Sequence, residues 1–145
     1  MSESIVVGTD GSDTANQAVA EAVRIAKALG AEIHLVSAFA PLRAKVSGAP
    51  EGAARVWQPL PDSEVESTLS QAEASVRLAG VPVKTHATQG DPAHALLETA
   101  DEVDADMIVV GSRGMHGAKR VLGSVPNTVS HRARCNVLIV STGGD

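Results

Sequence analysis

The stretch GDPAHALLETADEVDADMIVVGSRG, residues 90–114, places a helix pattern, a buried-strand pattern and a glycine-rich turn in direct succession. Asp91 is expected to cap the helix, with Pro92 at its first position, where a missing N–H is tolerated. The apolar residues expected on the inward face are Ala93, Leu96, Ala100 and Val103. A short apolar run, ADMIVVG, follows at residues 105–111 and predicts a strand buried in a sheet.

The rest of the chain repeats this alternation of strand and helix patterns. Apolar runs at residues 4–8, 31–39, 81–88 and 136–141 predict four further strands. Helical periodicity is expected at residues 14–29 and 62–79 and in a shorter segment at 124–132, with Gly30 and Gly80 at helix C-caps. The expected inward faces are Ala15, Ala18, Ala22, Ile25 and Leu29 in the first helix, and Val65, Leu69, Ala72, Val76 and Ala79 in the second. The pattern predicts an α/β fold, with one five-stranded parallel sheet and helices on both faces.

Length, charge and composition indicate how many domains to expect and which classes of protein to exclude. A chain of 145 residues with a net charge of −5 is expected to form one domain, residues 1–145, and shows no basic footprint for nucleic acid. No apolar run approaches the length of a membrane span, and the first residues, MSESIVVG, do not resemble a signal peptide, so a cytoplasmic location is expected. Residues 41–61, with four prolines and no usable period, are expected to form a long flexible loop.

In a doubly wound sheet, ligands bind beyond the carboxyl ends of the strands where the strand order reverses. If the order is 3-2-1-4-5, the turns GTDGS (residues 8–12) and GSRG (residues 111–114) face each other across that crevice. The strand order is an assumption at this point, and it makes this crevice the candidate site.

The glycine-rich stretch GSRGMHGAKRVLGSV, residues 111–125, fits neither of two common phosphate loops. A Walker A loop would require a glycine where His116 or Lys119 stands, and the dinucleotide pattern G-x-G-x-x-G is not matched. Closely spaced glycines followed by a helix that begins near Ser124, the expected N-cap, nevertheless suit an anion. An ordinary strand-to-helix loop explains the same residues, and both interpretations stay open.

Three segments together show a resemblance. GTDGS, residues 90–114 and GSVPNTVSHRARCNVLIV (residues 123–140) closely resemble the universal stress protein family. The nucleotide-binding branch of that family carries G-x2-G-x9-G-Ser/Thr after the fourth strand, which Gly111, Gly114, Gly123 and Ser124 match. Eight residues instead of nine separate Gly114 from Gly123. The resemblance implies binding of ATP, with Mg²⁺ on the phosphates, and the shortened spacing raises AMP or cyclic AMP as the alternative ligand.

The resemblance also implies contacts for the rest of the nucleotide. Asp10 matches the acidic residue that contacts the ribose, although the same residue could serve only as a turn residue before the first helix. Ala38 matches the backbone position that contacts adenine. The candidate set is completed by Arg113, which lies within the glycine pair and could neutralise phosphate charge, and by Thr9 and Val125, which adjoin the matched residues.

The family resemblance implies a regulatory role in the stress response as a homodimer. The dimer would pair through the last strand, at Val137, Leu138, Ile139 and Val140, and act on a protein partner that the sequence does not identify. No constellation of carboxylate, His or Ser positions an attacking water, so an efficient enzyme is not expected. The four histidines outside the glycine-rich stretch show no metal-ligand spacing. A slow ATPase or phosphotransferase, and a nucleotide-free interaction protein, remain the alternatives.

Overall fold

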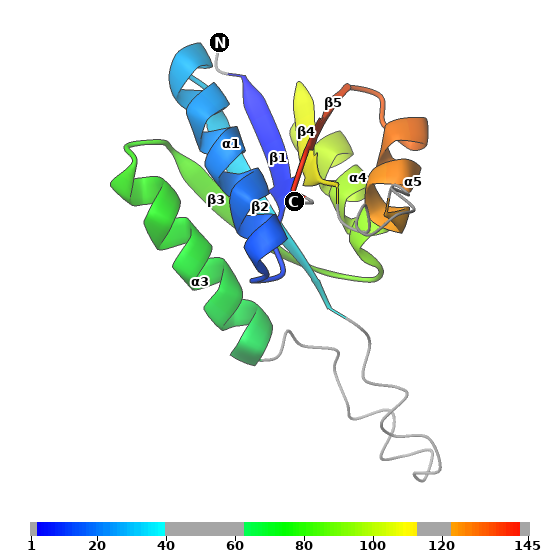
Figure 1. The fold of residues 1–145 in the computed structure, drawn as a ribbon, viewed down its shortest axis with the longest axis horizontal. Helices are drawn as coiled ribbons and strands as arrows, with labels where there is room; N and C mark the ends of the chain where they lie inside the picture. Colours follow the sequence, from blue (N-terminus) through cyan, green and yellow to red (C-terminus); the bar gives the residue numbers. More distant parts are fainter. Residues whose placement is uncertain (1–2, 40–62, 113–122, 143–145) are drawn as a thin grey trace, which may run out of the picture.

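The computed structural model describes residues 3–39, 63–112 and 123–142. The described elements alternate along the chain, as the sequence predicts (Figure 1). In chain order they are β1 (Ser4–Gly8), α1 (Asp13–Leu29), β2 (Glu32–Phe39), α3 (Ser63–Leu78), β3 (Val83–Gln89), α4 (Pro92–Val103), β4 (Met107–Gly111), α5 (Ser124–Arg132) and β5 (Asn136–Val140). The predicted loop at residues 41–61 lies outside the described residues, as do Arg113 and Gly114.

The five strands form one parallel sheet in the order β3-β2-β1-β4-β5, which confirms the order assumed from the sequence. The register aligns Gly8 at the end of β1 with Val36 of β2, and Gly111 at the end of β4 with Val140 of β5. From β1, the chain adds β2 and β3 on one side of the sheet and then crosses to add β4 and β5 on the other side. The strand order therefore reverses between β1 and β4. The carboxyl ends of β1 and β4 therefore border the switch point of the topology.

Helices cover both faces of the sheet: α1 and α3 lie on one face, and α4 and α5 lie on the other (Figure 1). Because successive side chains of a strand point to opposite faces, Ile5 and Val7 of β1 pack with α1 and α3, while Val6 packs with α4 and α5. All three are buried. The two aliphatic cores hold the strand ends, and hence the turns after them, in fixed positions.

The helix ends mostly follow the sequence signals. Asp91 caps α4 by accepting a hydrogen bond from the N–H of His94, at 2.9 Å, and Pro92 is the first helical residue. Gly30 ends α1 in the left-handed conformation, with φ 70°. The expected burial of Leu29 is wrong, since it is 49% exposed. The buried stripe of α1 includes Val19 and Ala26, so it is rotated about one position round the helix from the predicted face.

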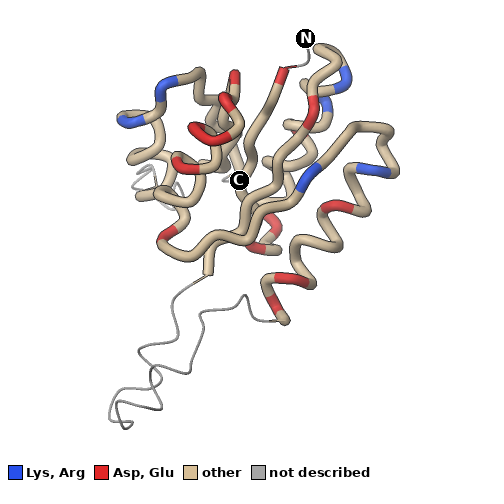
Figure 2. The backbone as a smooth tube through the Cα atoms, turned by 180° about the vertical axis from the view of Figure 1, so that it is seen from behind, with Lys and Arg blue, Asp and Glu red and all other residues tan. Residues whose placement is uncertain are grey.

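Charge is distributed without a continuous basic stripe along the part of the chain that the structure describes (Figure 2). Acidic residues are spread along α3 and α4, while Lys and Arg occur in a few small groups at separate places (Figure 2). None of the described helices is long and apolar enough to cross a membrane.

Candidate nucleotide-binding crevice

A crevice lies at the carboxyl ends of β1, β2 and β4, at the predicted switch point. Its walls come from the ends of these three strands, from the first turns of α1 and α5, and from one side of α4. Five of the nine candidate residues line it: Thr9, Asp10, Ala38, Gly111 and Val125. These residues come from four separate segments of the chain, which the fold brings together at one edge of the sheet.

The remaining candidates lie at the rim or outside the described residues. Gly123 and Ser124 form the start of α5, next to Val125, and Ser124 lines an adjoining hollow together with Asp91 and Arg132. Arg113 and Gly114 belong to the part of the chain that the structure does not describe. Gly114, the second glycine of the family motif, therefore remains a prediction from the sequence.

The turn after β1 is held by hydrogen bonds of its own residues. The N–H of Thr9 donates to the carbonyl of Val36, at 2.9 Å, and ties the turn to β2. The N–H of Ser12 donates to Oδ1 of Asp10, at 2.9 Å, and Oγ of Ser12 accepts from the N–H of Ala15, at 3.2 Å. Ser12 therefore caps α1, and the Asp10 carboxylate lies exposed on the crevice with one oxygen engaged in the turn.

The end of β4 is fixed against β5 by buried polar groups. The N–H of Ser112 donates to the carbonyl of Val140, at 2.8 Å, and the N–H of Thr142 donates to Oγ of Ser112, at 2.9 Å. A Cβ on Gly111 would lie 3.2 Å from Cγ2 of Thr142 and 3.4 Å from the carbonyl oxygen of Thr14. Close packing against Thr142 and Thr14 is thus enough to explain a glycine at position 111, without a ligand.

The start of α5 differs from the prediction. The N-cap is Gly123, with φ −63° and ψ 163°, and no described side chain accepts a capping hydrogen bond from this turn. The prediction of Ser124 as N-cap is wrong, because Ser124 already has helical conformation and its side chain is exposed. Within the part of the chain that the structure describes, no side chain caps the N–H groups of Ser124 and Val125, which lie at the positive end of the helix dipole.

The crevice combines an apolar wall with a polar rim. Val36, Leu96 and Val110 form much of its inner surface, which suits a flat aromatic group. Asp10 is the only charged side chain among the described residues that line it. No group of three or more His, Cys, Asp or Glu residues within the described segments could hold a metal ion. The apolar wall and polar rim suit a partly apolar ligand with a polar end.

Several lining residues were not predicted from the sequence. Ser12, Thr14 and Ser37 line the crevice, and Leu96 and Pro126 contribute apolar surface. Ser12 lies in the turn GTDGS, which the sequence places at the crevice, although it was not named among the site residues. Ser37 is 4% exposed, and nothing in the sequence pattern marks it as a site residue, because it is simply one polar residue within an apolar strand.

Comparison with known proteins assigns the chain to a family. Residues 1–141 match the family model described as "Universal stress protein family". The universal stress protein Rv1636 of Mycobacterium tuberculosis is 37% identical over 142 residues, which cover 97% of each chain. The universal stress protein MJ0531 of Methanocaldococcus jannaschii is 35% identical over 142 residues, which cover 94% of this chain and 80% of the relative.

A solved structure supports the same assignment. The crystal structure of a universal stress protein in complex with cAMP superposes with a TM-score of 0.72 and is 35% identical, and the match covers 97% of both chains. The sheet order, the crevice at the switch point and the match across nearly the whole sequence agree with one another. The chain belongs to the universal stress protein family.

Proposed function

We propose that the crevice binds an adenine nucleotide and that the protein acts as a nucleotide-dependent regulator in the stress response. The observation that carries the proposal is the convergence of Thr9, Asp10, Ala38, Gly111 and Val125 on one crevice beside the uncapped start of α5. The family resemblance of the sequence implies a place in the site for Asp10, Ala38 and Gly111, and Thr9 and Val125 adjoin matched residues. Convergence at the switch point of a parallel sheet is what a nucleotide site of this fold requires.

The three parts of a nucleotide match three parts of the crevice. The base lies against the apolar wall of Val36 and Leu96, where the backbone of Ala38 is available for its polar edge. The ribose hydroxyls donate to the Asp10 carboxylate, which is exposed at the rim. The phosphates accept from the first-turn N–H groups of α5, where the helix dipole favours negative charge.

Two ligand forms compete for this site. ATP with Mg²⁺ follows from the glycine motif, in which Gly111, Gly123 and Ser124 match the nucleotide-binding branch. A monophosphate, AMP or cyclic AMP, is supported by the shortened spacing in residues 115–122. The relative of 35% identity solved in complex with cAMP supports it as well. One phosphate needs only the start of α5, whereas three need the whole glycine-rich segment.

Calorimetric titration of the nucleotide-stripped protein with ATP·Mg²⁺, AMP and cyclic AMP tests the proposal. We expect micromolar binding of at least one of the three and its loss in Gly123→Val. The backbone of Gly123 is in an extended conformation that any residue adopts, so valine adds bulk at the phosphates without straining the main chain. Absence of binding by all three nucleotides would leave the nucleotide-free interaction protein as the better assignment.

Asp10 offers a matched pair of variants for the ribose contact. Asp10→Asn keeps an oxygen for the N–H of Ser12 but removes the charge, and we expect about tenfold weaker binding, or roughly 1.4 kcal/mol. Asp13→Asn removes the same charge from an exposed residue in the first turn of α1 that does not line the crevice, and it should leave binding unchanged. Mg²⁺-dependent ATP turnover that disappears in Asp10→Asn would favour the weak-enzyme alternative.

The proposed regulator is a homodimer that pairs through β5. This strand lies at the edge of the sheet, and the side chains of Val137, Leu138, Ile139 and Val140 are all only partly buried. An apolar edge strand is a ready template for pairing with another chain. In sedimentation at micromolar concentration we expect a dimer, converted to monomer by Ile139→Glu but not by Thr85→Glu at the opposite edge. A wild-type monomer would contradict the pairing.

A further inference from the structure

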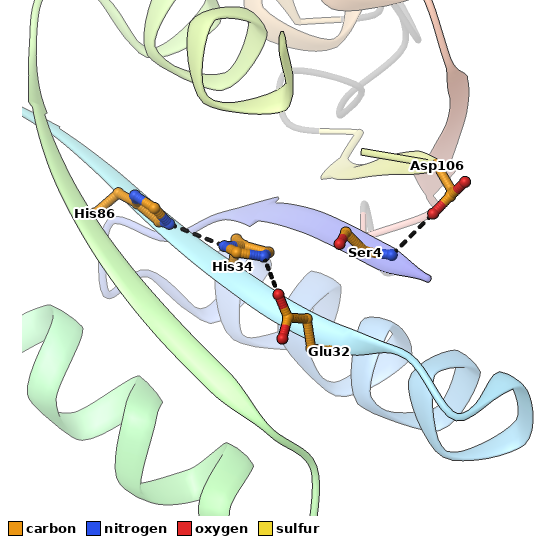
Figure 3. Close-up of polar contacts among 5 residues, drawn as sticks. All are labelled: Ser4, Glu32, His34, His86 and Asp106. Atoms are coloured by element: carbon orange, nitrogen blue, oxygen red, sulfur yellow. Dashed lines mark hydrogen bonds and ion pairs between the residues drawn. The ribbon is translucent and has the colours of Figure 1, made fainter. Parts of the chain in front are cut away.

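Three polar side chains form a hydrogen-bonded chain across β2 and β3 (Figure 3). Nε2 of His34 lies 2.7 Å from Oε2 of Glu32, and Nδ1 of His34 lies 3.0 Å from Nε2 of His86. His34 is only 3% exposed, and His86 is half-buried on the edge strand. The two histidines are 52 residues apart in the sequence, so no spacing pattern reveals the contact.

The hydrogen-bond directions in this chain follow from the chemistry of its ends. An ionised Glu32 carboxylate can only accept, so Nε2 of His34 carries the proton. In the neutral ring Nδ1 of His34 then accepts, and Nε2 of His86 must donate to it. The chain thus links the buried part of β2 to the edge strand β3 with both histidines in defined tautomers.

The hydrogen bond between the two histidines survives one added proton but not two. A proton on Nδ1 of His86 leaves the donated hydrogen bond from its Nε2 in place. A second proton, on Nδ1 of His34, puts two N–H groups against each other at 3.0 Å and two positive rings side by side. The result is loss of the hydrogen bond and electrostatic repulsion between β2 and β3.

The surroundings of His86 oppose even the first proton. Burial lowers the pKa of His86 from its ordinary value of 6.5, and the adjacent His34 and the Lys84 ammonium on β3 lower it further. The Glu102 carboxylate on α4 acts in the opposite direction and does not outweigh them. From β1, the residue paired with His34 is the apolar Val6, which adds no charge.

We propose that Glu32, His34 and His86 form a proton-responsive link that weakens the pairing of edge strand β3 with β2 when the pH falls below neutral. The link reaches the crevice wall through the sheet register. His86 is paired with Val36, which lines the crevice and whose carbonyl accepts from the N–H of Thr9. The link itself does not depend on which ligand the crevice binds.

The direction of the pH effect follows from proton linkage. His86 binds a proton less readily in the folded protein than in the unfolded chain, so the unfolded chain holds more protons between the lowered pKa and 6.5. The contribution of a neutral His86 to stability is complete above about pH 6.5 and declines as the pH falls through that interval, because the first proton must enter a partly buried position beside His34. Because the link joins only β2 and β3, the loss should be greatest at that edge.

Hydrogen exchange resolved by residue tests the proposal in the intact protein at pH 7.5 and 5.5, after correction for the intrinsic pH dependence of exchange. We expect protection of the β3 amides to fall about threefold or more at the lower pH relative to the β5 amides, which serve as an internal reference. His86→Gln should remove this difference between the two edges. His94→Gln, a matched change at an exposed histidine on α4, should preserve it. Equal behaviour of β3 and β5 in the wild type would overturn the proposal.

A second measurement needs no substitution. Nitrogen-15 chemical shifts of the imidazole rings at pH 7.5 should show the proton of His34 on Nε2, hydrogen-bonded to Glu32, and that of His86 on Nε2. The opposite tautomer of His34 would overturn the assigned hydrogen-bond directions and with them the proton-responsive link.

Discussion

The turn after β1 and the start of α5 border the same crevice, yet they use their backbone N–H groups differently. In the first, Asp10 and Ser12 accept hydrogen bonds from the turn and from the first turn of α1. At the second, Gly123 begins the helix and no side chain of the described residues caps it. Among these residues, one helix start is satisfied by side chains and the other is not. In the proposed function, this difference places an anion at α5 and a hydroxyl-bearing group at Asp10.

The largest expected effect comes from adding the missing cap at α5. In Gly123→Asp, the carboxylate accepts from the first-turn N–H groups and repels the phosphates, so we expect nucleotide binding to weaken at least a hundredfold, about 2.7 kcal/mol. Thermal unfolding should show no loss of stability, since aspartate is as good a cap as glycine or better. Gly123→Asn, a cap without charge, should weaken binding less. Unchanged affinity in Gly123→Asp would place the phosphates elsewhere.

The glycines that end β1 and β4 should differ in their tolerance of a methyl group. Gly111→Ala brings Cβ to 3.4 Å from the backbone oxygen of Thr14 and 3.2 Å from Thr142, so we expect a cost of about 1–3 kcal/mol in the free energy of unfolding. Gly8→Ala meets only the flexible tip of Leu96, at 3.3 Å, and should cost less. Urea unfolding of both variants checks the order, and the reverse order would contradict the packing argument.

The smallest expected effects separate the two serines at the helix starts. Ser12→Ala removes the cap of α1 and should lower the free energy of unfolding by about 1 kcal/mol. Ser124→Ala changes an exposed first-turn side chain that caps nothing, so we expect a change within about 0.5 kcal/mol. Similar costs for the two substitutions, measured by the same unfolding experiment, would show that Ser124 has a structural role after all.

Much of the fold could be predicted because its signals are local. The five apolar runs became the five strands, and the cap at Asp91 and the left-handed Gly30 ended helices where the sequence places them. The exposed Leu29 and the N-cap at Gly123 were mispredicted. In both cases the local pattern is compatible with two alignments of the helix, and packing against the sheet selects one of them.

The sequence by itself determined the order of strands and helices along the chain, because this order depends on periods of two and 3.6 residues and on caps, which are properties of neighbours in the chain. The segments that meet at the crevice followed from the sequence only with an assumed strand order and the family resemblance. Only the tertiary structure decided that Gly111 packs against Thr142, and that His34 and His86 form a hydrogen bond across two strands. Such contacts depend on the sheet register, which is set by the packing of the whole domain and by no short stretch of sequence.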